Sequence, residues 1–356
     1  MAKFSEVLTI VNGRNQKQVV CDDGKYPIYG SGGIMGYAND YICKAETVVI
    51  GRKGSINKPI FVETPFWNVD TAFGLCANSE KLNPKYLYYF CEKFDFEKLN
   101  TTVTIPSLTK SNLLNVEIPL PNLEKQKQIV ELLDKVTSLI FLRKQQLSKL
   151  DELVKARFVE MFGDISNSRK VPMQDVCKII TDGTHQPPKF VLSGIPFLFV
   201  SNIVTNEIHY DAEKFISEET YNELIKRTPI EVGDVLLSTV GSYGHPAVVK
   251  ENKPFCFQRH IAYLKPNNSE VNSEYLRCAI LSTDLQRQID ESVKGIAQKT
   301  LNLSEIRKLR LPLPSLSLQN QFAAFVERID RQKQTVQQSL EKLELMKKAL
   351  MQEYFG

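Results

Sequence analysis

The sequence predicts an α+β protein in which two β-rich domains alternate with two long helices, so that the second half of the chain repeats the first. Three observations predict this class. A segment of about 55 residues occurs twice. Each copy carries apolar residues at heptad spacing, and each follows a region of short apolar runs bounded by turn residues. The chain has 356 residues, which is enough for two domains.

The internal repeat is clearest between residues 108–163 and residues 301–356, which align without a gap. The matched residues are Pro119-Leu120-Pro121 with Pro312-Leu313-Pro314, Gln126 with Gln319, and Phe162-Gly163 with Phe355-Gly356. The regions before each copy correspond more loosely, with small insertions where loops tolerate them. The expected organisation is a β-rich domain at 1–121, a helix at 122–163, a second domain at 164–314 and a second helix at 315–356.

Each repeated segment predicts one long helix with a narrow apolar seam. Its apolar positions alternate between steps of three and four over about four heptads, without an internal proline or glycine. They are Ile129, Leu133, Val136, Ile140, Leu147, Leu150 and Val154 in the first copy, and Phe322, Val326, Ile329, Val336, Leu340, Leu343 and Leu350 in the second. A helix of about 35 residues rises about 50 Å, more than a globular core needs. Each helix packing on its own domain is one reading; the narrow seam favours pairing of the two helices.

The regions between the helices have the pattern of short strands joined by turns. Apolar runs at Thr47–Ile50, Pro196–Val200 and Asp234–Ser238 are bounded by glycine-rich or asparagine-rich turns. Asn83 and Pro84 form a capping signal that predicts a helix over Lys85–Phe96, and Glu274–Gln288 is its expected counterpart in the second domain. Both domains are therefore expected to be predominantly β with a few helices.

Composition and charge narrow the class of protein. The net charge is only +4, which permits a nucleic-acid partner but does not demand one. No apolar run is long enough for a membrane helix, and no signal peptide is recognisable at the N-terminus. The seven cysteines form no Cys-x-x-Cys pair and are odd in number, which predicts reduced thiols in a cytoplasmic protein without structural zinc.

A search for catalytic motifs finds none with adequate support. Gly30-Ser31-Gly32-Gly33 is not followed by the Gly-Lys-Ser/Thr of a phosphate-binding loop. Asn83-Pro84-Lys85-Tyr86 partly matches a loop of adenine methyltransferases, but a helix cap explains it better. The four histidines lack metal-ligand spacing. We therefore expect no catalytic residue, no bound cofactor and no metal in this chain.

Polar side chains instead concentrate in the expected loops, and their types are those that pair with base edges or donate to phosphate. In the first domain they are Arg52, Lys53, Ser55 and Asn68. In the second they are Asp182, Thr184, His185, Ser201, Asn202, Ser238, Thr239, Ser242, Tyr243, Gln258 and Arg259. Ordinary turn chemistry accounts for such residues equally well one at a time. As a set they are candidates for a DNA-binding surface.

The chain resembles the specificity subunits of type I restriction–modification systems over essentially its full length. The resemblance rests on the two Pro-Leu-Pro…Gln segments that lead into the long helices and on the two Phe-Gly endings. It rests further on Asp182-Gly183-Thr184-His185, on Pro196–Ile203 and on Gly233–Gly244 in the second domain. Tyr29–Gly33 and Gly51–Ser55 of the first domain are similar to the same family.

This resemblance implies two target recognition domains at opposite ends of an antiparallel helix pair. Each domain would read one half of a bipartite DNA target, and the helices would set the gap. Half-sites on one face of DNA lie about 34 Å apart, a distance that such a helix pair can match. The implied partners are double-stranded DNA, two modification subunits that methylate adenine N6, and restriction subunits. S-adenosylmethionine, ATP and Mg²⁺ would be bound by those partner subunits and not by this chain.

Two alternatives stay open at this stage. The chain would equally suit a specificity polypeptide of another bipartite restriction system, which the sequence alone does not separate from type I. A coiled-coil adaptor whose β-rich domains bind protein is a different class, and it would show no sequence-dependent binding to DNA.

Overall fold

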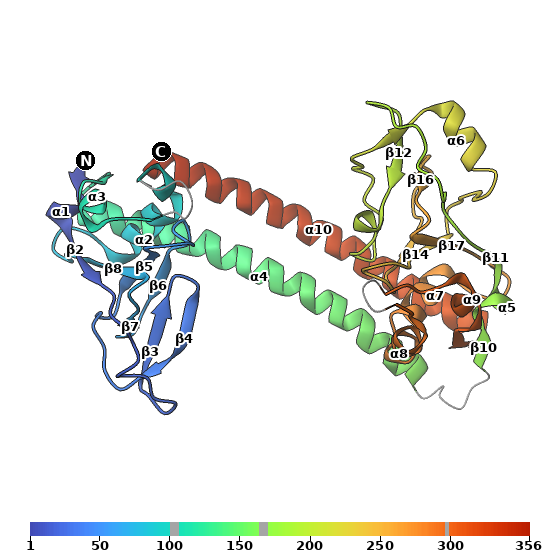
Figure 1. Ribbon diagram of the computed structural model, residues 1–356, viewed down its shortest axis with the longest axis horizontal. Coiled ribbons are helices and arrows are strands. Elements are labelled where there is room, and N and C mark those ends of the chain that lie inside the picture. Colours follow the sequence, from blue (N-terminus) through green and yellow to red (C-terminus); the bar gives the residue numbers. More distant parts are fainter. Residues whose placement is uncertain (100–106, 164–169, 296–298) are drawn as a thin grey trace. The chain divides into compact units, whose positions relative to one another are not determined.

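The computed structural model describes residues 1–99, 107–163, 170–295 and 299–356. These residues form two compact units, one of Met1–Gln146 with Val336–Gly356 and one of Leu147–Thr335. Each unit contains one β-rich domain together with part of each long helix (Figure 1). The domain boundary expected at residue 164 lies outside the described residues.

Unit 1 is built on two sheets. The larger is antiparallel, and its order is β2 (Leu8–Asn12), β8 (Ala72–Ala77), β5 (Thr47–Gly51) and β6 (Ile60–Val62). The smaller has the order β4 (Gly33–Ala38), β3 (Tyr26–Gly30) and β7 (Trp67–Asn68), with β3 and β7 parallel. A short pair joins β1 (Ala2–Lys3) to β9 (Glu117–Ile118). The helices are α1 (Phe4–Val7), α2 (Pro84–Lys93) and α3 (Lys110–Leu114), with a 3₁₀ turn at Phe96–Leu99.

Unit 2 repeats this plan. Its larger sheet has the order β11 (Cys177–Asp182), β17 (Ile261–Pro266), β14 (Val235–Ser238) and β15 (Pro246–Val248). Its smaller sheet has the order β13 (Phe215–Ile216), β12 (Ile195–Leu198) and β16 (Cys256–Phe257), and β10 (Lys170–Pro172) pairs with β18 (Arg310–Pro312). The helices are α5 (Met173–Val176), α6 (Glu218–Leu224), α7 (Ser273–Ile280), α8 (Thr283–Ser292) and α9 (Leu303–Lys308), with a 3₁₀ turn at Val200–Asn202.

The two units share their topology strand for strand. In each, the larger sheet places its strands in the same chain order, and the smaller sheet contains one parallel pair: β3 with β7 in unit 1 and β12 with β16 in unit 2. The α+β class and the internal repeat expected from the sequence are thereby confirmed. The repeat was visible in the sequence of the helices, whereas the loops that differ between the units obscured it in the domains.

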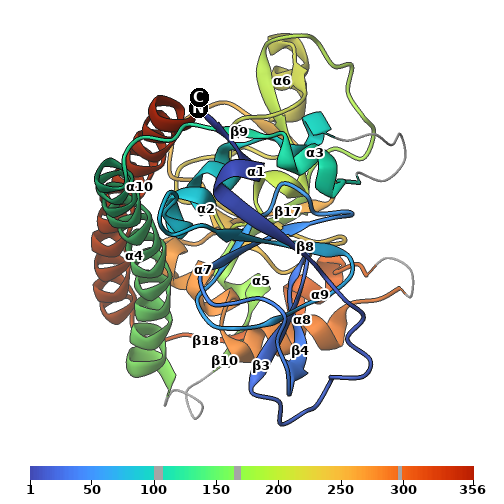
Figure 2. The ribbon, with the colours of Figure 1, turned by 90° about the vertical axis from the view of Figure 1, so that its left-hand side faces the viewer.

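The long helices α4 (Leu123–Phe162) and α10 (Leu316–Phe355) lie side by side (Figure 1 and Figure 2). In unit 1, Arg143 Nε donates to Ser339 Oγ over 3.2 Å and Lys144 pairs with Glu344 at 2.9 Å. In unit 2, the rings of Phe158 and Phe322 lie 5.5 Å apart. From Arg143 to Phe158 along α4, the contacted residue of α10 moves back from Ser339 to Phe322, so the helices pair antiparallel.

Burial follows the predicted heptad seam. Every apolar seam position of both helices is buried or half-buried. The polar residues in the seam are paired: Arg143 binds Ser339, and Lys333 lies 2.9 Å from Asp151 in unit 2. Lys347 donates to Glu92 of α2 over 2.8 Å. Polar seam residues that find such partners limit the helices to one register.

The repeated Phe-Gly endings anchor the helix ends to the domains. Phe355, at the end of α10, packs against Tyr86 of α2 with ring centroids 4.9 Å apart. Phe162, at the end of α4, packs against Tyr275 of α7 at the same 4.9 Å. Each tyrosine hydroxyl in turn donates to a carbonyl of the repeated Pro-Leu-Pro motif, Tyr86 to Pro119 over 3.0 Å and Tyr275 to Pro312.

Two of the helices expected in the domains differ in extent. The Asn83 cap of α2 is confirmed, since its side chain accepts from the amides of Lys85 and Tyr86, but the helix ends at Lys93 and not at Phe96. The single helix expected over Glu274–Gln288 is wrong. Ser282 adopts an extended conformation there and caps a second helix, so α7 ends at Ile280 and α8 begins at Thr283.

Candidate nucleic-acid interface

In unit 2, three loops rich in polar residues meet where strands β11, β17 and β14 begin or end. The loop after β11 holds Thr184, whose carbonyl accepts from the amide of Arg259 over 3.0 Å. The carbonyl of His260, just before β17, accepts from the amide of Thr239, just after β14, over 2.9 Å. Backbone hydrogen bonds therefore hold residues 183–186, 258–260 and 239–245 in one surface, which we call the unit 2 strand-end surface.

The side chains of this surface form local pairs. Asp182 binds both Arg227 and His185, the latter at 2.9 Å between Oδ2 and Nε2. Ser242 Oγ lies 3.2 Å from His245 Nε2. Arg259 is exposed. Its guanidinium reaches solvent beside these groups, as a residue that contacts a base or a phosphate must.

Two of the three histidines of this surface, His245 and His260, favour their neutral forms. Burial lowers the pKa of His245, and burial together with the neighbouring Arg259 cation lowers the pKa of His260. A neutral imidazole offers one donor and one acceptor, which suits hydrogen bonding to base edges. Arg259 is the one arginine in the three segments of this surface, and they contain no lysine.

Several of the predicted contact residues have structural partners. Ser238 and Thr239 are buried, and Ser238 Oγ accepts from the amide of His245 over 2.9 Å. Asn202 is half-buried and holds its own loop, because its side chain accepts from the amide of Phe199 and donates to the carbonyl of His209. In this conformation the side chains of Ser238 and Thr239 are not accessible to a ligand. Ser201 is exposed.

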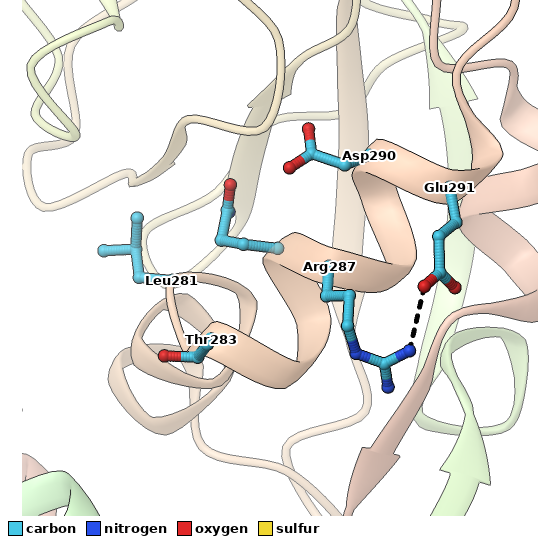
Figure 3. A pocket seen from close by; sticks show the side chains of 6 residues that line it. Leu281, Thr283, Arg287, Asp290 and Glu291 are labelled. Atoms are coloured by element: carbon cyan, nitrogen blue, oxygen red, sulfur yellow. Dashed lines mark hydrogen bonds and ion pairs between the residues drawn. The ribbon is translucent and has the colours of Figure 1, made fainter.

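Helix α8 supports the loop at 239–245 from beneath. Gln286 Nε2 donates to the carbonyl of Gly244 over 2.9 Å, and Tyr243 donates its hydroxyl to Asp290 over 3.0 Å. Figure 3 shows the shallow hollow on this helix, where Arg287 and Glu291 form an ion pair at 2.9 Å. The charged groups of the hollow already bind one another, and Gln286 and Asp290 hold the 239–245 loop. We therefore assign α8 a structural role and no ligand.

Unit 1 has an equivalent surface, formed by residues 12–14, 51–55 and 68–72. The amide of Arg52 donates to the carbonyl of Thr71 over 2.8 Å, and the amide of Arg14 donates to the carbonyl of Asn68 over the same distance. Arg52, Lys53 and Ser55 are exposed, as a DNA contact requires. We call these residues the unit 1 strand-end surface.

Asn68 does not belong to the accessible part of that surface. Its side chain is completely buried, and Nδ2 donates to the carbonyl of Ala72 over 3.1 Å. The prediction of a base contact by Asn68 therefore does not hold in this conformation. The residue shapes the 68–72 segment that carries Asp70 and Thr71 to the surface.

The sequence analysis missed Arg14 and the segment around it. Asn12-Gly13-Arg14 in unit 1 is equivalent to Asp182-Gly183-Thr184 in unit 2. Gly13 follows β2, and its amide donates to the carbonyl of Ala72, the first residue of β8. Gly183 follows β11, and its amide donates to the carbonyl of Ile261, the first residue of β17. A Cβ on Gly13 would lie 1.7 Å from the carbonyl oxygen of Val69, and one on Gly183 would lie 2.1 Å from that of Phe257. The shared signal is an Asn-Gly or Asp-Gly pair directly after an apolar run.

Among the described residues, no three His, Cys, Asp or Glu side chains gather as metal ligands would. Over the same part of the chain, the long helices are too polar and the other helices too short to cross a membrane. The described cysteines are all free thiols.

The fold is thus that of a duplicated protein with one candidate recognition surface in each unit, both attached to the same helix pair. The chain belongs to the family of type I restriction modification DNA specificity domains, whose family model matches residues 1–152 and 166–345. The family resemblance expected from the sequence is thus confirmed.

Individual relatives agree with this assignment. The chain is 23% identical over 317 residues to the specificity subunit of the type I restriction enzyme EcoBI of Escherichia coli, covering 80% of this chain and 66% of that subunit. It is 22% identical over 330 residues to the MjaVIII specificity subunit of Methanocaldococcus jannaschii, covering 86% of this chain and 75% of that subunit.

Solved structures show the same fold. The S subunit of a type I restriction–modification system from M. genitalium aligns with a TM-score of 0.63 at 16% identity, over 100% of this chain and 95% of that chain. A second solved structure, described as showing complex assembly and conformational transition of the type I R-M system, contains a chain that aligns with a TM-score of 0.59 at 17% identity. The alignment covers 99% of this chain and 96% of that chain.

Proposed function

We propose that this chain is the sequence-reading subunit of a type I restriction–modification enzyme. Each strand-end surface reads one half of a bipartite DNA target. The observation that carries this proposal is the duplication of the surface: the same three strand ends meet in both units, but they present different side chains. Two copies of one scaffold with different contact residues suit a target made of two different half-sites.

The long helices supply the remaining roles in this proposal. They set the gap between the half-sites and dock two modification subunits, which methylate adenine N6, through the faces of residues 122–161 and 315–354 that point away from the seam. Exposed apolar side chains on those faces support such docking: Leu139, Phe141, Leu142, Val159, Leu345 and Met346 are all at least 43% exposed. Restriction subunits complete the assembly.

The chemistry belongs to the partners. S-adenosylmethionine, ATP and Mg²⁺ are bound by the modification and restriction subunits, and the target adenine is flipped into the pocket of the modification subunit. The partners also supply further phosphate contacts, which is consistent with the small net charge of +4 on this chain. The chain itself contributes specificity and no catalytic step.

Methylation mapping tests the proposal directly. The chain is expressed with its modification subunit in cells that lack DNA methylation, and modified adenines are located by long-read sequencing. A bipartite N6-methyladenine motif that appears only when this chain is present is the expected result. An active methyltransferase complex that leaves no such motif would contradict the proposal and would favour an adaptor that binds protein.

A further inference from the structure

The hairpin formed by β3 and β4 exposes apolar side chains immediately after its turn. Ile34 is 55% exposed and Met35 is 64% exposed. Strand β4 is the edge of its sheet and carries no charged residue over Gly33–Ala38. Soluble proteins usually protect an exposed edge strand with charges or with a covering element. At the far end of β4 the edge is already covered, since the amide of Cys21 donates to the carbonyl of Tyr37 over 2.9 Å. Within the described residues, the part near the turn, with its two exposed apolar side chains, has no such cover, and we infer that a ligand covers it.

The turn of this hairpin is unusually slim. It consists of Gly30-Ser31-Gly32-Gly33, and Gly33 adopts a φ of 118°, which other residues rarely tolerate. A Cβ added to Gly32 or Gly33 would meet no atom within 4 Å, whereas one on Gly30 would lie 2.5 Å from Met35 Sδ. The turn is therefore slim at Gly32 and Gly33. A two-stranded ribbon of this kind fits the major groove of DNA, which is about 12 Å wide.

The turn also lies against the unit 1 strand-end surface. A Cβ on Gly51 would be 3.0 Å from the Cβ of Ser31, and the amide of Val69 donates to the carbonyl of Tyr29 over 3.0 Å. Gly51 directly precedes Arg52, and Val69 directly follows Asn68, whose carbonyl accepts from the amide of Arg14. The apolar tip is therefore next to exposed cations.

Charge changes sign along the hairpin. At the end away from the turn, Val20 bridges to Ala38, and the neighbouring chain carries Asp22, Asp23 and Asp40 against one cation, Lys25, so this end is net acidic. A polyanion is thus attracted to the turn and repelled from the opposite end. The exposed apolar side chains and the cations beside them match the major groove of DNA, which places thymine methyl groups between two lines of phosphates.

We propose that the β3–β4 turn enters the major groove and that Ile34 and Met35 contact the C5-methyl groups of thymines in the half-site read by unit 1. The inference rests on the proposed function and assigns the chemistry that unit 1 recognises. Unit 2 lacks this device, because β12 and β13 are joined by the longer connection 199–214, which carries Ser201, Asn202 and Thr205. The two units consequently read their half-sites by different contacts.

Deoxyuridine scanning tests this assignment. The full chain is assembled with its modification subunits, and each thymine of the mapped target is replaced in turn by deoxyuridine, which lacks only the methyl group. For the wild-type complex, at least one replacement is expected to weaken binding about fourfold, the factor that corresponds to one buried methyl group. All sensitive positions should lie in a single half-site. Binding of the Ile34→Ser/Met35→Ser variant should be the same with thymine and with deoxyuridine at those positions.

Val20→Ser is the matched control, because Val20 is 54% exposed on the segment that bridges to Ala38, at the acidic end of the hairpin and away from its turn. This variant should keep the full sensitivity to deoxyuridine. The inference is overturned if no replacement weakens the wild-type complex, or if the double variant retains the deoxyuridine penalty. Failure of the proposed function is distinct from both results, because a wild-type complex would then bind all duplexes without regard to sequence.

Discussion

Gln126 and Gln319 make the same three hydrogen bonds in the two units. Each Oε1 accepts from the backbone amide of an N-cap asparagine, Asn83 or Asn272, over 2.8 Å. Each Nε2 donates to two carbonyls, one of them from the last proline of the Pro-Leu-Pro motif. Both side chains are completely buried. One glutamine thereby joins the start of a long helix to the start of the domain helix beside it.

Replacing either glutamine by alanine should destabilise the unit that contains it. Gln126→Ala leaves the Asn83 amide and two carbonyls without their partner, and each buried unsatisfied group costs about 1–3 kcal/mol. We expect the free energy of unfolding to fall by at least that amount in urea denaturation. Gln128→Ala, at an exposed position two residues further along α4, should leave the stability unchanged. Equal effects of the two substitutions would contradict the role assigned to Gln126.

A methyl group at either tight glycine should disrupt its strand-end surface. Gly13→Ala and Gly183→Ala would place Cβ within 2.1 Å of a backbone oxygen, so the loop must move. We expect each substitution to reduce DNA binding and to lower the melting temperature. Gly32→Ala is the control for stability, since its Cβ would meet nothing within 4 Å. A stable, fully active Gly183→Ala variant would show that the loops do not need this close approach.

Arg14→Ala and Arg259→Ala should affect different half-sites. Arg14 lies in the unit 1 surface and Arg259 in the unit 2 surface. A bidentate arginine–guanine contact contributes about 1–3 kcal/mol of discrimination. Methylation mapping of each variant should therefore show relaxed sequence preference in one half-site only, and not in the same one. Equal loss of affinity on every sequence would identify the arginine concerned as a phosphate contact.

The pH dependence of stability should reflect His260. Its pKa in the folded protein lies below the ordinary value because burial and the Arg259 cation disfavour protonation. The unfolded chain, with a pKa of about 6.5, then binds protons more readily, so stability falls as the pH drops from about 6.5 through the folded pKa. His260→Gln should lose less stability than the wild type between neutral and mildly acidic pH. Identical losses in the two proteins would contradict this assignment.

An insertion in the helices should change the gap between half-sites. Seven residues inserted after Leu142, with a matching heptad in α10, preserve the seam while lengthening both helices by about 10 Å. We expect methylation mapping to return the same two half-sites with a longer gap. An unchanged gap would show that the helices do not set it.

The sequence predicted the framework better than the surfaces. Heptad spacing, Asn83 and the repeated Gln126 and Gln319 are local or periodic signals, and the structure confirms the helices and the cap that they indicate. The fused helix over Glu274–Gln288 was wrong because Ser282 reads as a tolerable helix residue until its capping geometry is seen. Burial of Asn68 depends on the parallel pairing of β7 with β3, which no local pattern reveals.

Arg14 was missed although a local signal precedes it. The Asn-Gly pair before it is a visible turn signal, but its link to the loop at Gly51–Ser55 depends on β2 and β5 meeting on either side of β8. Such a relation between distant segments requires the sheet order. Once that order is known, the equivalence with Asp182-Gly183-Thr184 follows at once.

The identical anchoring of both domains also bears on how such a protein changes over generations. Tyr86 and Tyr275, with Phe355 and Phe162, make the same junction in each half, while the side chains of the strand-end surfaces differ between the halves. A gene that acquires a foreign domain by recombination would thus receive a part whose attachment is already standardised. New specificity can then arise in a single genetic exchange, without a series of compensating mutations in the scaffold.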